Sequence, residues 1–208
     1  PNPSSAASDV YKRQSESPFT IKIEDKEGNT IYKSLNDIGF YEDGNGRIIN
    51  KFEIKENDNF YGFGEKSGFI NKKMSRMVNN PMDSMGYDAK STDSLYKHIP
   101  FYIKLDGDTK KASGYFYHNT FINEFDMGKE KSNYWNRYAS FKANGGDIDL
   151  FVINGPKIND VIKGYTFLTG TSMMLPKQAL GYLASSMYYA ELDKDCDEAI
   201  EKFIDIAV

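Results

Sequence analysis

The alternation that decides the fold is first seen in Phe19-Thr20-Ile21-Lys22-Ile23, where every second side chain is apolar. Such alternation predicts a β-strand with one face buried and the other in water. The next residues, Asp25-Lys26-Glu27-Gly28-Asn29, are typical of a turn, and Ile31-Tyr32 begins a return strand. The pattern therefore predicts an antiparallel hairpin.

Short strands and turns continue this pattern as far as residue 154. Candidate strands cover residues 48–49, 52–54, 99–105, 114–119, 138–142 and 148–153. Many short strands separated by turns are typical of a β-sandwich, so we expect a mainly β domain. Between Pro156 and Gly170 the apolar spacing becomes helical, with a proline near the start and a glycine at the end. This segment is predicted to be a connecting helix.

The last part of the chain has the pattern of one β/α unit. Residues 179–189 are apolar and aromatic without alternation, which is typical of a strand covered on both faces. Asp193 then provides a cap for a helix with apolar residues at helical spacing. A closed (β/α)8 barrel needs eight such units, about 250 residues in all. We therefore expect the truncated start of a barrel here.

Composition excludes several classes of site. The 208 residues carry a net charge of −4 and show no basic stripe, which argues against a nucleic-acid or anionic-membrane partner. No apolar run reaches the roughly 20 residues of a membrane-spanning helix. The single cysteine, Cys196, excludes an internal disulfide, and the two histidines show no metal-ligand spacing. We expect no cofactor and no metal.

The first residues differ from the rest of the chain. The run Ser4-Ser5-Ala6-Ala7-Ser8-Asp9-Val10-Tyr11-Lys12-Arg13-Gln14 back-translates, codon for codon, into a transposase-type sequencing adapter. We interpret residues 4–14 as a translated adapter and expect residues 1–18 to be a disordered terminus. The natural N-terminus, with any signal peptide, is then expected to be missing.

Eight motifs, taken in order, resemble those of glycoside hydrolase family 31. They are YGFGEK at 61–66, LYKHIPF at 95–101, GYFYHNT at 114–120, FDMG at 125–128, GGDID at 145–149, INGP at 153–156, YTFLTG at 165–170 and LPKQALGY at 175–182. The resemblance covers residues 19–208. It implies a galactose-mutarotase-like β-sandwich over residues 19–174, followed at 175–208 by the first unit of a (β/α)8 catalytic barrel.

The same resemblance implies a retaining, exo-acting α-glycosidase of the α-glucosidase and α-xylosidase kind, with an α-linked oligosaccharide or α-glycoside as substrate. Retaining hydrolysis uses two carboxylates about 5 Å apart. In this family both are aspartates on later barrel strands, and no matching stretch is present here. We expect the chain to be an N-terminal fragment without glycosidase activity.

The resemblance also points to substrate-binding residues. Family members place an Asp on a sandwich loop beside the hydroxyls of the terminal sugar, and Asp83 is the matching candidate, with Asp88 as the alternative. Pro81 and Met82 interrupt the usual spacing before Asp83. At the end of the predicted barrel strand, residues 185–189 stand where α-glucosidases of the family commonly have a Gln-x-Arg-Trp-x-Tyr type sequence, with Met187 in place of the tryptophan and Tyr188 directly after it. Met187 is expected to loosen the pocket wall there, and packing between barrel and sandwich is an equal alternative.

The sequence also allows a second hypothesis about the function. The chain would then be a non-catalytic carbohydrate-binding or interaction sandwich, with the C-terminal unit as an appendage. The sequence leaves the sugar, the linkage and the cellular location undetermined, although we favour the cytoplasm.

Overall fold

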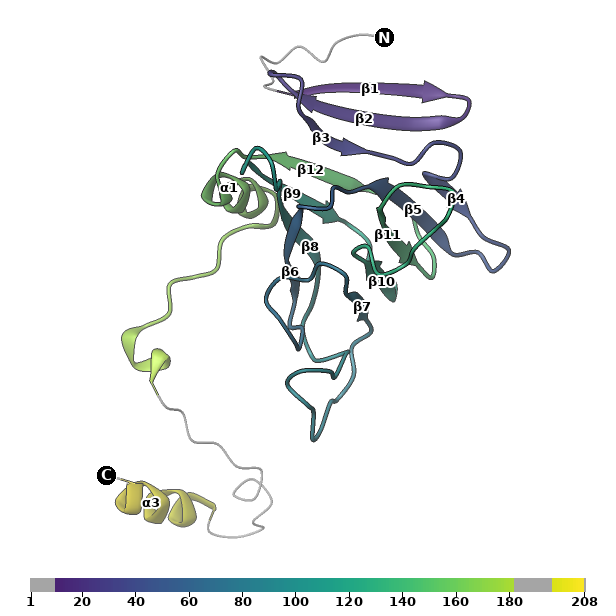
Figure 1. The fold of residues 1–208 in the computed structure, drawn as a ribbon. Coiled ribbons are helices and arrows are strands. Elements are labelled where there is room, and N and C mark those ends of the chain that lie inside the picture. The colour runs from purple at the N-terminus through teal and green to yellow at the C-terminus, as the bar shows by residue number, and fades with distance from the viewer. Residues whose placement is uncertain (1–9, 182–195, 208) are drawn as a thin grey trace. The chain divides into compact units, whose positions relative to one another are not determined.

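A computed structural model describes residues 10–181 and 196–207, and the chain divides into two compact units after Gly170. The first unit consists of twelve strands and one helix among its described residues (Figure 1). The strands are β1 (Val10–Glu16), β2 (Phe19–Asp25), β3 (Thr30–Lys33), β4 (Phe40–Glu42), β5 (Ile48–Glu53), β6 (Asn59–Gly64), β7 (Arg76–Asn79), β8 (His98–Leu105), β9 (Ala112–Tyr117), β10 (Asn123–Asp126), β11 (Tyr138–Ala143) and β12 (Leu150–Asn154). The helix is α1 (Ile158–Thr169).

The predicted hairpin is present as β2 and β3. Its turn is closed by Asp25, whose Oδ1 accepts hydrogen bonds from the backbone N–H groups of Glu27 (3.0 Å) and Asn29 (2.8 Å). Gly28 adopts a φ of 83°, a conformation that favours glycine. The hairpin prediction is therefore confirmed down to its turn residues.

Strand β1 corrects one expectation. Residues 10–16 were expected to belong to a disordered terminus, but they pair with β2 in an unbroken antiparallel register from Val10↔Asp25 to Glu16↔Phe19. Six of the seven β1 residues are exposed. Pairing with a free strand edge uses backbone groups and requires no particular side chains, which explains why the pattern gave no signal for it. The adapter interpretation stays a prediction.

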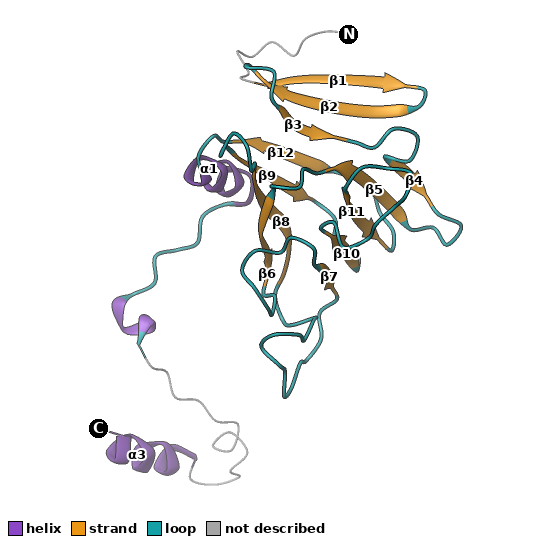
Figure 2. Ribbon diagram, in the orientation of Figure 1, coloured by secondary structure: helices purple, strands orange, loops and turns teal. Residues whose placement is uncertain are grey.

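Two sheets form the predicted sandwich (Figure 2). One has the strand order β4-β5-β11-β10-β7 and the other β12-β9-β8-β6. Their facing sides form one core of fully buried aromatic residues, among them Phe60, Tyr102, Tyr115, Phe125 and Phe141. The Tyr102 ring stacks on Tyr115 with centroids 4.9 Å apart and meets the edge of Phe125 at 5.9 Å. Burial of these rings is the main source of stability.

Helix α1 covers part of the outer face of the β12-β9-β8-β6 sheet. Tyr165 stacks on Phe101 with ring centroids 4.0 Å apart, and Val161 is fully buried. The approach is close because of Gly114, where a Cβ would lie 2.5 Å from Val161 Cγ1. The predicted connecting helix is confirmed.

The second unit gives a different outcome for the predicted strand. Lys177–Leu180 form a 3-10 helix and Gly181 is a bend, so the prediction of a strand from Ala179 is wrong for its first three residues. The backbone N–H of Ala179 donates to the carbonyl of Pro176, which takes it out of reach of strand pairing. Residues 182–189 lie outside the described residues, so the barrel start stays a prediction. The following helix, α3 (Cys196–Ala207), agrees with the predicted one.

Within the described residues, no helix is long and apolar enough to cross a membrane.

Candidate functional site

The loop of residues 80–97, which joins β7 to β8, carries the predicted substrate residue Asp83. Asp83 is exposed, and its Oδ1 accepts a hydrogen bond of 2.7 Å from the Tyr96 hydroxyl. This hydrogen bond raises the pKa of Tyr96. The second oxygen, Oδ2, has no hydrogen-bond partner within residues 10–181 and 196–207. The loop therefore presents an oriented carboxylate with one free oxygen at the surface.

Lys66, just after β6, holds the two ends of this loop together. Its side chain is only 2% exposed, and its Nζ donates to Asp93 Oδ1 (2.9 Å) and to the Val78 carbonyl (2.5 Å). Asp93 Oδ2 in turn accepts the Val78 N–H at 2.6 Å. Burial lowers the pKa of Lys66, while the bond to Asp93 opposes that shift. One ammonium group thus links β6, β7 and the segment before β8.

Two serines extend this network toward Asp83. The Ser94 hydroxyl donates to the Val78 carbonyl at 2.8 Å, and the Ser84 hydroxyl donates to the Ser94 carbonyl at 2.5 Å. Ser94 is 3% exposed, so its bond is shielded from water. Because Ser84 follows Asp83 directly, these bonds limit where the Asp83 backbone lies.

Gly64 and Glu65 secure the other side of the loop. A Cβ on Gly64 would lie 2.4 Å from the Lys97 carbonyl oxygen, and Gly64 has a φ of 81°, so glycine is required there. The Glu65 N–H donates to that carbonyl at 2.8 Å, and Glu65 Oε2 accepts the Lys97 N–H at 3.1 Å. Glu65 is therefore a structural residue.

A cleft of about 330 Å³ lies where the loop leaves β7. Its lining includes Asn79, Pro81, His98, Phe116, His118 and Phe121. His98 is bound through Nε2 to the Leu95 carbonyl at 2.8 Å, and burial lowers its pKa. Imidazole, amide and aromatic groups suit a polar ligand such as a sugar.

The other sequence-predicted residues have different outcomes. Asp88 closes a turn, where its Oδ1 accepts the N–H groups of Lys90 (2.7 Å) and Ser91 (2.9 Å). These bonds, the one from Lys90 first, lower the pKa of Asp88. Because they all end on Oδ1, Asp88, like Asp83, keeps an Oδ2 without a hydrogen-bond partner in the described part of the chain. Met187 and Tyr188 lie outside the described residues, so their roles stay predictions.

Sequence reasoning missed Lys66, Asp93 and Tyr96 as the supports of the loop. Lys66 and Tyr96 lie in the YGFGEK and LYKHIPF stretches, so a signal was present, but the 27-residue separation of Lys66 and Asp93 hides their pairing. Over the described residues, no group of three His, Cys, Asp or Glu side chains is placed to hold a metal ion.

Comparison with protein-family models finds a match over residues 4–126. The matching model is described as the glycosyl hydrolase 31 N-terminal galactose mutarotase-like domain.

Comparison with known proteins gives consistent similarities. The chain is 33% identical to α-glucosidase 2 of Bacillus thermoamyloliquefaciens, over 90% of this chain and 23% of that protein. It is 32% identical to an α-glucosidase of Saccharolobus solfataricus, over 85% of this chain and 24% of that protein. Among solved structures, a family 31 dextranase of Flavobacterium johnsoniae in complex with isomaltotriose is 32% identical, with a TM-score of 0.75, over 84% of this chain and 20% of that chain. The chain thus spans about a quarter or less of the length of these relatives.

Proposed function

This chain belongs to the glycosyl hydrolase 31 N-terminal, galactose mutarotase-like domains, and from that membership we propose that it is the N-terminal part of a retaining, exo-acting α-glycosidase. The observation that carries the proposal is the family match, supported by the similarity to two α-glucosidases and a dextranase. The substrate class that follows is an α-linked oligosaccharide or α-glycoside.

Within that enzyme, the 80–97 loop is proposed to contribute to the sugar pocket through Asp83. An ionised carboxylate accepts strong, charge-assisted hydrogen bonds from sugar hydroxyls. Asp83 has one oxygen bound to Tyr96 and the other without a partner in the described part of the chain, which leaves an acceptor for a ligand. Asp88 also has an Oδ2 without a partner in the described residues, and it is the alternative candidate because the bonds to its Oδ1 tie it to its own turn at Lys90 and Ser91.

Catalysis itself is proposed to reside in residues that this chain does not contain. A retaining mechanism needs a nucleophile and an acid/base carboxylate about 5–5.5 Å apart, positioned around one sugar. In barrels of this kind they come from loops at the ends of several strands, which one β/α unit cannot supply. The 208-residue chain alone should therefore be inactive.

The test is an activity assay of this chain beside the longer protein encoded by the same gene, with 4-nitrophenyl α-glucoside and α-xyloside. We expect turnover by the longer protein, with retention of anomeric configuration, and none above buffer by the 208-residue chain. Turnover by the chain alone would contradict the proposal. A longer protein that binds isomaltotriose but hydrolyses no α-glycoside would instead favour the carbohydrate-binding sandwich.

A further inference from the structure

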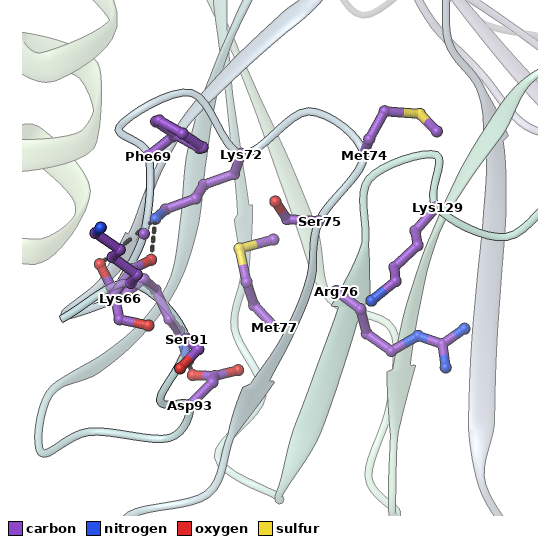
Figure 3. A pocket seen from close by; sticks show the side chains of 13 residues that line it. Lys66, Phe69, Lys72, Met74, Ser75, Arg76, Met77, Ser91, Asp93 and Lys129 are labelled. Atoms are coloured by element: carbon purple, nitrogen blue, oxygen red, sulfur yellow. Dashed lines mark hydrogen bonds and ion pairs between the residues drawn. The ribbon is translucent and has the colours of Figure 1, made fainter. Parts of the chain in front are cut away.

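A second cavity, of about 210 Å³, lies between the segment after β6, the start of β7 and the far end of the 80–97 loop (Figure 3). Its lining is strongly cationic. Five of the lining residues are basic, namely Lys66, Lys72, Arg76, Lys90 and Lys129, and one, Asp93, is acidic. Figure 3 shows Lys72 on one side of Met77 and Lys129 with Arg76 on the other.

Two of these cations are already neutralised. Lys66 pairs with Asp93 at 2.9 Å, and Asp93 uses its other oxygen on the Val78 N–H. The Arg76 guanidinium pairs with Asp126 at 3.0 Å, outside the cavity lining. Neither carboxylate is therefore available to the three remaining lysines.

Lys72, Lys90 and Lys129 form no ion pair with any residue in the part of the chain that the structure describes. Lys72 is the decisive one, because it is only 5% exposed and its Nζ donates just to the carbonyls of Ser67 (2.6 Å) and Lys66 (3.4 Å). A buried ammonium without a counter-charge is unfavourable. Burial accordingly lowers the pKa of Lys72, with the Lys66 charge adding to the effect and Asp93 opposing it.

We propose that this cavity is a binding site for a tetrahedral oxyanion, a phosphate or sulfate group, free or as an ester. Lysine ammonium groups bind phosphate as point charges, and the excess of basic over acidic side chains in the lining favours an anion in this cavity. Ser75 also lines the cavity, and its hydroxyl has no hydrogen-bond partner among the described residues. A neutral sugar would leave the three positive charges uncompensated.

The proposed site is distinct from the proposed function and does not depend on it. A bound anion would lie in the field of charges from three segments, namely Lys72 before β7, Lys90 in the 80–97 loop and Lys129 after β10. It would thereby hold in place the loop that carries Asp83.

The test is binding of inorganic phosphate, inorganic sulfate and glucose 6-phosphate to the 208-residue chain by calorimetry at constant ionic strength, with glucose as the uncharged probe. We expect the three anions to bind and glucose not to bind at this site. The double variant K90Q/K129Q should bind at least about tenfold more weakly, because two charge-assisted contacts are lost. Both residues are exposed, so folding should be unaffected.

K163Q is the matched control, since Lys163 is exposed on α1 and does not line the cavity. The affinity of K163Q for phosphate should stay within about twofold of that of the parent chain, because the variant loses one distant charge and no contact with the anion. K72M should abolish binding with an unchanged circular dichroism spectrum. Tighter binding of glucose 6-phosphate than of phosphate would support an ester ligand, and equal binding a free anion. Absence of binding, or equal losses in K90Q/K129Q and K163Q, would overturn the proposal.

Discussion

The space between the two sheets and the 80–97 loop are held by different kinds of contact. Between the sheets, Phe125 is fully buried and touches the rings of Phe63, Tyr102, Tyr117 and Phe141. Most of the loop is exposed, and its position depends on a few polar bonds made by Lys66, Asp93 and Ser94. We therefore expect substitutions in the core and in the contacts of the 80–97 loop to have separate effects.

The largest effect is expected from Phe125→Ala. Removing a buried phenyl ring leaves a cavity between the sheets and should lower the free energy of unfolding by about 3–5 kcal/mol. Denaturant unfolding measures this change. Phe167→Ala is the matched control, because Phe167 is 89% exposed on α1, and it should change stability by less than about 0.5 kcal/mol. Similar values for the two variants would show that the core does not carry the stability.

A smaller and more local effect is expected from Lys66→Met. The variant loses the bonds to Asp93 and Val78, which should cost about 1–3 kcal/mol. Amide hydrogen exchange should become faster in residues 80–97 and stay slow in β9 and β11. Lys97→Met is the control, because Lys97 bonds to Glu65 through its backbone N–H and carbonyl, which the substitution keeps. Equal loosening of loop and sheets would contradict the separation.

The pH dependence of unfolding should report on a polar contact that lies in the sandwich and not in the 80–97 loop. Burial tends to raise the pKa of Asp106, but bonds from Lys55 and from the N–H groups of Thr109 and Asp108 outweigh it and lower the value to about 2. Because the folded-state pKa lies below the ordinary value of 3.8, this stabilisation is present above about pH 4 and is lost as pH falls toward 2. It should amount to about 1–2 kcal/mol.

Denaturant unfolding of Asp106→Asn between pH 6 and pH 2.5 measures that contribution. The variant should be less stable at pH 6 and nearer to the parent chain at pH 2.5. Asp108→Asn removes a 58%-exposed partner of the same lysine and should keep most of the acid dependence. A constant difference between D106N and the parent chain across this range would show that the ionised form of Asp106 gives no net stabilisation.

Local patterns predicted the elements that local contacts determine. The Asp25 turn and helix α1 follow from neighbouring residues, and the alternation of the long strands follows from their buried face. Strands β7 and β10 have four residues each and pair with one another at sequence separations of 44 to 50 residues, from Asn79↔Asn123 to Arg76↔Asp126. Such short segments carry too little periodicity to be recognised alone.

The candidate site shows the same limit. Asp83 was identified through a family resemblance, whereas its partner Tyr96 and the Lys66–Asp93 pair depend on how β6, β7 and β8 come together. These contacts arise from tertiary packing, which no spacing in the sequence encodes directly. The motifs identified these strands as similar to those of one family, but the role of each residue in them followed only from the three-dimensional structure.

We propose that the sandwich provides Asp83 as a substrate contact of an α-glycosidase. The most direct measurement is kcat/KM for an α-glucoside with the longer protein carrying Asp83→Asn, beside the same protein carrying Asp88→Asn. Loss of a charge-assisted bond to the sugar should lower kcat/KM by about 10- to 100-fold for D83N, with D88N within about threefold of the parent. Equal activity of D83N and the parent, or a larger loss in D88N, would contradict the account.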